Sequence, residues 1–231
     1  MDPDQAEVQK FNALAHDWWA ENGAFRALHR LNPLRLDWME KMVSLSGKKI
    51  LDAGCGGGIL SEGLARAGAR VTGIDPGLDL VRVARAHSLE SGLSIDYRHG
   101  SVEELAEDEA GTFDIVTCLE VLEHTSDTAG MIWACSRLVR PGGTVFFATL
   151  NRNMKSFLCA IVGAEYILGF LPRGSHSFRR FIRPSELARN ARNADLNAFA
   201  ITGIGYSLLG DRFHLTRDTS INYMLACTRL P

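Results

Sequence analysis

A glycine-rich turn and the carboxylate that follows it carry the clearest chemistry of this chain. The segment Asp52-Ala-Gly-Cys-Gly-Gly-Gly58 comes after a short apolar run, and its glycines have no Cβ atoms to keep a ligand away from the backbone. Asp75 ends a second apolar run, 21 residues beyond Gly54. A carboxylate in that place accepts hydrogen bonds from both hydroxyls of a ribose. The pattern predicts a site for an adenosine-type ligand, bound by Gly54, Gly56 and Asp75.

The order of the glycines narrows the choice of ligand. A dinucleotide site needs G-x-G-x-x-G, but its third position falls on Ile59 or Ser61 in the two possible registers. No Gly-Lys-Ser/Thr follows the turn, so it is not a phosphate-binding P-loop. A nicotinamide-dependent dehydrogenase is therefore disfavoured. The pattern Asp-x-Gly-x-Gly-x-Gly resembles motif I of the S-adenosylmethionine-dependent methyltransferases with the Rossmann-like fold, which implies this methyl donor as cofactor.

An acidic pair and a histidine follow a later apolar run. If the chain turns helical at Glu120, then Glu120, Glu123 and His124 share one helical face. Two carboxylates and an imidazole on one face suit a divalent cation, either Mg²⁺ or Mn²⁺ on the oxygens or Zn²⁺ with the histidine. Such a cation would bind two adjacent substrate oxygens and lower the pKa of the one to be methylated. The alternative is a solvated helix start, where acidic residues stabilise the helix dipole.

Arg35 stands shortly before the first apolar run, in Leu31-Asn-Pro-Leu-Arg-Leu36. A guanidinium group can bind the carboxylate of a methionine moiety through two hydrogen bonds. A surface cation is the alternative interpretation of a single arginine.

Alternating apolar runs and helical patterns must position these residues. Such alternation predicts an α/β fold, a doubly wound and mostly parallel sheet with helices on both faces. The C-terminal run predicts an antiparallel strand, paired with another near Phe199–Tyr206. Strands are expected at 49–52, 70–75, 95–98, 113–118 and 144–149, and helices at 59–67, 78–90 and 127–138.

The 231 residues fit a single domain with four parts. These are an N-terminal helical cap (1–47), a cofactor-binding core (48–150), an apolar and basic insertion (151–184) and a completion of the sheet (185–231). Within the insertion, Phe157–Leu171 carries a single charge and has cationic side chains on both flanks. This composition predicts an apolar helical element that faces a membrane surface through 153–183, although a helix that covers the core would have a similar composition.

The overall charge excludes one class of substrate. Lysine and arginine total 25 against 27 aspartates and glutamates, so no nucleic-acid partner is expected. The N-terminal residues lack the apolar run of a secretory signal. Five scattered cysteines without a C-x-x-C pair are typical of buried, reduced thiols, and a cytoplasmic location is predicted.

Several segments carry a narrower resemblance. The glycine turn identifies only the cofactor, whereas Asn32-Pro-Leu-Arg35, Leu150-Asn-Arg-Asn153 and Val162-Gly-Ala-Glu-Tyr-Ile-Leu168 resemble the ubiquinone biosynthesis O-methyltransferases. The resemblance covers nearly the whole chain. It implies O-methylation of catechol-type hydroxyls on polyprenylated precursors, peripheral association with the inner face of a membrane, and contact with other proteins of the pathway. It also implies that the cofactor contacts Arg35, Gly54, Asp75 and Leu119, and that Glu120, Glu123 and His124 bind the metal.

Two other functions fit the same residues. One is a methyltransferase for another small phenol, and the other is a non-catalytic lipid-associated module that keeps the cofactor site. The apolar insertion favours a substrate with a lipid tail. Adenine is expected to be held by a backbone N–H group or by Ser101, because no acid stands there.

Overall fold

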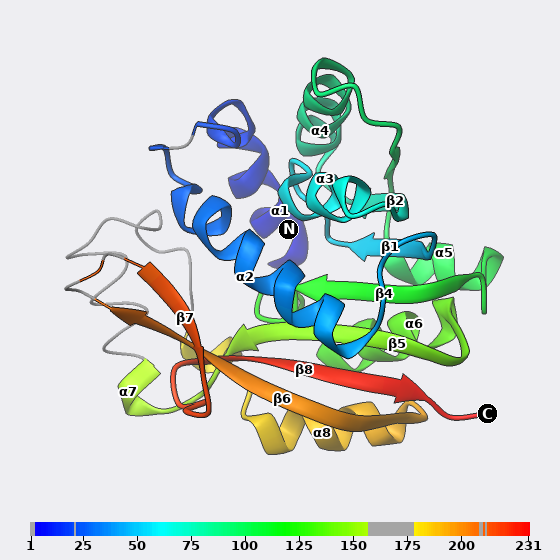
Figure 1. Ribbon diagram of the computed structural model, residues 1–231, viewed down its shortest axis with the longest axis vertical. Helices are drawn as coiled ribbons and strands as arrows, with labels where there is room; N and C mark the ends of the chain where they lie inside the picture. The colour runs from blue at the N-terminus through cyan, green and yellow to red at the C-terminus, as the bar shows by residue number, and fades with distance from the viewer. Residues whose placement is uncertain (1–2, 21, 157–177, 208–209, 211) are drawn as a thin grey trace.

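A single mixed sheet forms the centre of the computed structural model, which describes residues 3–20, 22–156, 178–207, 210 and 212–231 (Figure 1). Its eight strands are β1 (Lys49–Ala53), β2 (Arg70–Asp75), β3 (Asp96–His99), β4 (Phe113–Leu119), β5 (Val139–Leu150), β6 (Leu196–Ser207), β7 (Arg212–Thr216) and β8 (Asn222–Arg229). They follow the order β3-β2-β1-β4-β5-β8-β6-β7. The five strands from β3 to β5 are parallel, and β8 pairs antiparallel with both β5 and β6. The predicted doubly wound sheet with an antiparallel C-terminal strand is confirmed.

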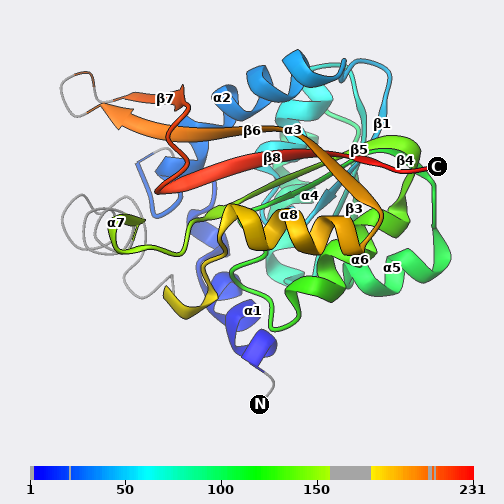
Figure 2. The ribbon, with the colours of Figure 1, turned by 90° about the horizontal axis from the view of Figure 1, so that it is seen from below.

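Helices cover both faces of this sheet because its strands are apolar on both sides. The helices are α1 (Pro3–Ala13), η1 (Ala15–Asp17), α2 (Arg26–Met42), α3 (Ile59–Arg66), α4 (Leu78–Glu90), α5 (Val102–Asp108), α6 (Thr128–Leu138), α7 (Met154–Ser156), η3 (Phe178–Arg180) and α8 (Pro184–Asn193). In β1, Ile50 belongs to the hydrophobic cluster that includes residues of α2 and α3. Its neighbour Leu51 points to the other face, where α5, α6 and α8 pack (Figure 2).

Some elements differ from the sequence-based expectation. Strand β5 begins at Val139 rather than 144, because Val139 already pairs with Phe113 before a register shift. Helix α5 was not expected from the apolar pattern, and a capping box at Ser101 and Glu104 starts it. The predicted cap at 1–47 is helical, but a 3-10 turn and a loop separate α1 from α2.

The insertion is described only at its edges. Residues 157–177 lie outside the described part of the chain, and with them most of the segment expected to face a membrane. Within the described ranges, none of the helices combines the length and the hydropathy needed to cross a bilayer.

The carboxyl ends of the parallel strands define where a ligand can bind. The arrowheads of β1, β4 and β5 point towards the same edge of the sheet in Figure 1. The glycine-rich loop follows β1, Asp75 ends β2, and Glu120 follows β4. Open α/β sheets bind their ligands at this edge, so the fold brings the predicted site residues to one place.

Candidate active site

The glycine-rich loop makes a tight bend between β1 and α3. Gly54 has a φ of +72° and its N–H donates to the carbonyl of Ile74 at 2.9 Å. A Cβ at Gly54 would lie 2.4 Å from Cγ2 of Val121, and a Cβ at Gly56 would lie 2.3 Å from Cζ2 of Trp18. The backbone conformation and the close neighbours therefore both require glycine here.

Asp75 ties this loop to the end of β2. Its Oδ2 accepts from the N–H of Gly56 at 2.9 Å, and its Oδ1 accepts from the N–H of Gly77 at 2.7 Å. Burial raises the pKa of Asp75 to about 6, against the effect of these two hydrogen bonds. Each carboxylate oxygen has a second lone pair, so the group can still accept hydrogen bonds from a ligand.

Asp52, at the start of the same bend, has a structural role. Its carboxylate accepts from the hydroxyls of Ser61 at 2.6 Å and Thr117 at 2.9 Å, which joins β1 to α3 and β4. Burial raises the pKa of Asp52 as well. Both oxygens of Asp52 therefore link β1 to neighbouring elements, whereas those of Asp75 hold the backbone of the glycine-rich loop and of the turn after β2.

Arg35 is a buried cation, and the surface interpretation of this residue is wrong. It lies on α2, is only 5% exposed, and pairs through Nη2 with the carboxylate of Glu120. Its Nε has no hydrogen-bond partner among the described residues. A buried donor left unpaired costs free energy, and an anionic ligand beside the loop would satisfy it.

The expected helix at Glu120 is wrong. Residues 120–124 form a turn, and Glu120 itself has a φ of +57°, a conformation that a residue with a side chain seldom adopts. The N–H of Glu120 donates to the carbonyl of Ala148 at 2.9 Å, which keeps it beside β5. Glu120, Glu123 and His124 therefore do not share one helical face. Backbone strain of this kind is concentrated at functional sites.

Glu123 lies beside Glu120 and is only 3% exposed. Its Oε2 accepts from the hydroxyl of Thr149 at 2.8 Å, while Oε1 has no hydrogen-bond partner in the described part of the chain. Burial, and then the neighbouring carboxylate of Glu120, raise the pKa of Glu123 well above its usual value. Two adjacent carboxyl groups fit either a shared proton or a cation that binds both.

His124 turns away from the two glutamates, towards α1. Its Nδ1 lies 3.1 Å from Oε2 of Glu7, and its ring meets the ring of Phe11 edge-on. The hydrogen bond with His124 lowers the pKa of Glu7. Among the residues that the structure describes, no three acidic, histidine or cysteine side chains converge to hold a metal ion. The two glutamates fit one side of a cation site, but His124 pairs with Glu7 instead of completing that site.

Sequence reasoning missed the N-terminal tryptophans as part of this site. Trp18 is 7% exposed, and its ring lies against Gly56 and Gly57. Its Nε1 has no partner within the described ranges. Leu119, expected to line the cofactor, ends β4 and is half-buried on the α2 side of the sheet. The two consecutive tryptophans at 18 and 19 were the sequence signal that could have indicated aromatic rings beside the glycine-rich loop.

The strand order, with the glycine loop between β1 and α3, is that of a Rossmann-like methyltransferase. Residues 51–147 match the family described as a methyltransferase domain. A solved magnesium protoporphyrin IX methyltransferase from Synechocystis with bound SAH has a TM-score of 0.72 at 20% identity, covering 99% of this chain and 100% of that one. A possible histamine N-methyltransferase from Thermotoga maritima has a TM-score of 0.70 at 16% identity, covering 96% of this chain and 99% of that one.

Sequence relatives narrow the class further. The chain is 55% identical to ubiquinone biosynthesis O-methyltransferase of Burkholderia ambifaria, over 98% of this chain and 97% of the relative. It is 53% identical to the protein of the same name from Dechloromonas aromatica, over 99% of both chains. The chain belongs to the ubiquinone biosynthesis O-methyltransferase family. The resemblance inferred from its motifs is confirmed. The protein is an S-adenosylmethionine-dependent O-methyltransferase rather than a dehydrogenase.

Proposed function

We propose that this protein transfers the methyl group of S-adenosylmethionine to a phenolic oxygen of a polyprenylated catechol or quinol in ubiquinone biosynthesis. Both 3-demethylubiquinol and the earlier polyprenyl-catechol intermediate fit this description. The observation that carries the proposal is a pair of buried charges, Asp75 and Arg35, at the strand edge that holds the glycine-rich loop. Opposite charges there match the ribose hydroxyls and the carboxylate of the donor.

Each residue at this edge has a distinct role in the proposal. Asp75 accepts from the ribose hydroxyls, and Gly54 and Gly56 let the donor approach the backbone. Arg35 binds the donor carboxylate through its Nε–H, which has no partner among the described residues, and Leu119 forms an apolar wall. The donor supplies an electrophilic methyl group on its sulfonium. The protein contributes by holding donor and phenol in line, which replaces a bimolecular encounter by an oriented one.

We also propose that Glu120 and Glu123 bind a divalent cation, with His124 as a third ligand. Two adjacent carboxylates favour Mg²⁺, whereas a histidine nitrogen admits Zn²⁺. A bound cation would supply a Lewis acid that lowers the pKa of the phenol. Calorimetric titration of the parent and of Glu123→Gln with Mg²⁺ tests this assignment, because the substitution replaces one carboxylate ligand by a neutral amide. Equal Mg²⁺ binding by both proteins would contradict the assignment.

A membrane surface is the proposed partner of the segment 153–183. The prenyl tail of the substrate makes this location useful, since such substrates dissolve in lipid. Three flanking cations already have protein partners: Arg152 pairs with Glu186, Lys155 with Asp218, and Arg180 donates to the carbonyl of His124. Lys155 keeps 54% of its side chain exposed and so can still meet a lipid phosphate. Flotation with anionic vesicles tests the association with the membrane. We also propose that the protein contacts other proteins of the ubiquinone pathway.

Product analysis is the experiment that tests the proposed reaction. The protein is incubated with labelled S-adenosylmethionine and each of the two prenylated substrates, with and without chelator. We expect label on a phenolic oxygen of at least one substrate, and slower transfer with chelator because the chelator removes the proposed cation. Transfer only to unprenylated phenols would indicate the small-phenol alternative. Donor binding without transfer to any phenol would indicate a non-catalytic module.

A further inference from the structure

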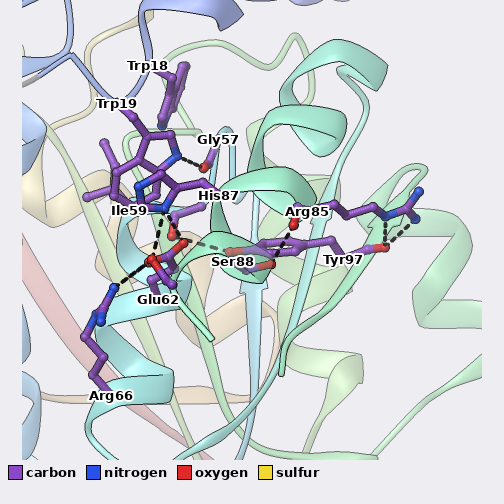
Figure 3. Close-up of polar contacts among 12 residues, drawn as sticks. Trp18, Trp19, Gly57, Ile59, Glu62, Arg66, Arg85, His87, Ser88 and Tyr97 are labelled. Carbon is purple, nitrogen blue, oxygen red and sulfur yellow. Dashed lines mark hydrogen bonds and ion pairs between the residues drawn. The ribbon is translucent and has the colours of Figure 1, made fainter. Parts of the chain in front are cut away.

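The rings of Trp19 and His87 stack on each other beside the glycine-rich loop, next to α3 and α4. The indole of Trp19 and the imidazole of His87 are parallel within 4°, and their centroids are 3.4 Å apart (Figure 3). Trp19 belongs to the segment between η1 and α2, whereas His87 lies in the last turn of α4. The stack therefore joins the N-terminal cap to the core that carries Asp75.

Both rings of this stack are fixed by hydrogen bonds. Nε1 of Trp19 donates to the carbonyl of Gly57 at 2.9 Å. Nδ1 of His87 lies 2.6 Å from Oε1 of Glu62, whose side chain is 2% exposed. The other oxygen of Glu62 accepts from Nη2 of Arg66 at 2.8 Å. Figure 3 shows this chain of contacts running from the loop carbonyl through the two rings to α3.

The glycine-rich loop is thus held by side chains at two consecutive residues. Asp75 binds the N–H of Gly56, and Trp19 binds the carbonyl of Gly57. The ring of Trp18 covers the same two glycines, since a Cβ on either would lie 2.3 Å from it. Glycine has the largest backbone freedom of any residue, so an unrestrained loop would lose much entropy when a ligand binds. Side chains that fix the loop in advance reduce that cost.

We propose that Trp19 is a positioning residue for the methyl donor: its indole N–H holds the glycine-rich loop in the donor-binding conformation, and the stack on His87 holds the indole. This inference rests on the donor site proposed above. Trp19 acts through the loop backbone rather than by touching the reacting atoms. Its loss therefore changes donor affinity and leaves the rate at saturating donor unchanged.

The contact has two separable parts. Trp19→Phe keeps an aromatic ring against His87 and removes the N–H donor. His87→Gln keeps a hydrogen-bond donor for Glu62 and removes the ring from the stack. Loss of a hydrogen bond or an aromatic pair of this kind raises a dissociation constant by roughly 2- to 12-fold. Trp133→Phe is the matched control, because Trp133 lies on α6 and is 51% exposed.

Calorimetry with S-adenosylhomocysteine, together with donor-dependent kinetics on a prenylated catechol, tests the proposal. We expect Trp19→Phe to weaken S-adenosylhomocysteine about 5-fold and His87→Gln about 3-fold, with the KM for the donor rising in parallel. The kcat of both and all constants of Trp133→Phe should stay within about twofold of the parent. If both Trp19→Phe and His87→Gln bind with parental affinity while their melting temperatures fall, the stack serves folding alone and the proposal is overturned. If the parent itself does not bind S-adenosylhomocysteine, the proposed function fails together with this inference.

Discussion

Replacing Asp75 by asparagine separates donor binding from folding. Asparagine has the same size but offers one oxygen and one amide group, so it can accept from only one of the N–H groups of Gly56 and Gly77. The other N–H loses its acceptor, which costs about 1 to 3 kcal/mol. The amide also provides one acceptor fewer for the ribose.

A second term offsets the loss of stability. Burial raises the pKa of Asp75 from 3.8 to about 6, so keeping this group charged at neutral pH costs roughly 3 kcal/mol. Asparagine is neutral and avoids that cost. The two terms are similar in size and opposite in sign, so the melting temperature of Asp75→Asn should stay close to that of the parent. The hydrogen bond from the ribose to a charged acceptor is lost without compensation, at about 2 kcal/mol or roughly 30-fold in affinity.

Calorimetric titration with S-adenosylhomocysteine and a thermal melt measure the two effects on the same protein. Asp79→Asn is the control, because Asp79 lies nearby on α4 and forms an exposed ion pair with Arg82. We expect Asp79→Asn to bind like the parent and Asp75→Asn to bind about 30-fold more weakly at an unchanged melting temperature. Parental affinity of Asp75→Asn would refute the assignment of the ribose to Asp75. Unfolding of this variant would refute the offset between the two terms.

Three further predictions concern the same edge of the sheet. Donor affinity should fall as the pH drops through about 6, because only the deprotonated Asp75 accepts from the ribose at both oxygens. Its raised pKa also means that its contribution to the stability of the fold decreases as the pH rises from 3.8 to about 6. Donor titrations and thermal melts over a pH series measure these two opposite trends. Gly56→Ala should destabilise the fold and weaken donor binding, because φ is +52° and the new Cβ meets Trp18. The control Gly47→Ala, with φ at +74° and no atom within 4 Å of the new Cβ, should lose only about 1 to 2 kcal/mol through backbone strain, as measured by denaturant unfolding. Ser101→Ala should lose about 1 kcal/mol of stability as a helix cap and keep the parental donor affinity; a large loss of affinity would instead place adenine on its hydroxyl.

The fold could be predicted from the sequence because the signals were local. The spacing of apolar residues gave β2 and α4 with the bounds that the structure shows, Arg70–Asp75 and Leu78–Glu90. The run of glycines could only be a bend with positive φ angles, and the structure has these at Gly54, Gly56 and Gly58. The antiparallel C-terminal strand was visible as an alternating pattern in the last residues.

The geometry of the acidic residues could not be predicted in this way. A positive φ at Glu120 depends on tertiary contacts, namely the hydrogen bond to Ala148 and the ion pair with Arg35. Spacing alone suggested a helix there, and it could not reveal that His124 turns to Glu7 on a distant helix. Long-range partners of this kind leave no trace in local periodicity. For the same reason the stack of Trp19 on His87 became visible only in three dimensions.

Transfer of a labelled methyl group is the most direct test of O-methylation by this protein. The protein is mixed with S-adenosylmethionine that carries an isotopic label on the methyl group and with a prenylated catechol, and the product is located by mass spectrometry. We expect label on a phenolic oxygen, at a rate that Asp75→Asn reduces when the donor is below saturation. Label on a carbon atom, or no transfer by a protein that binds the donor, would contradict it.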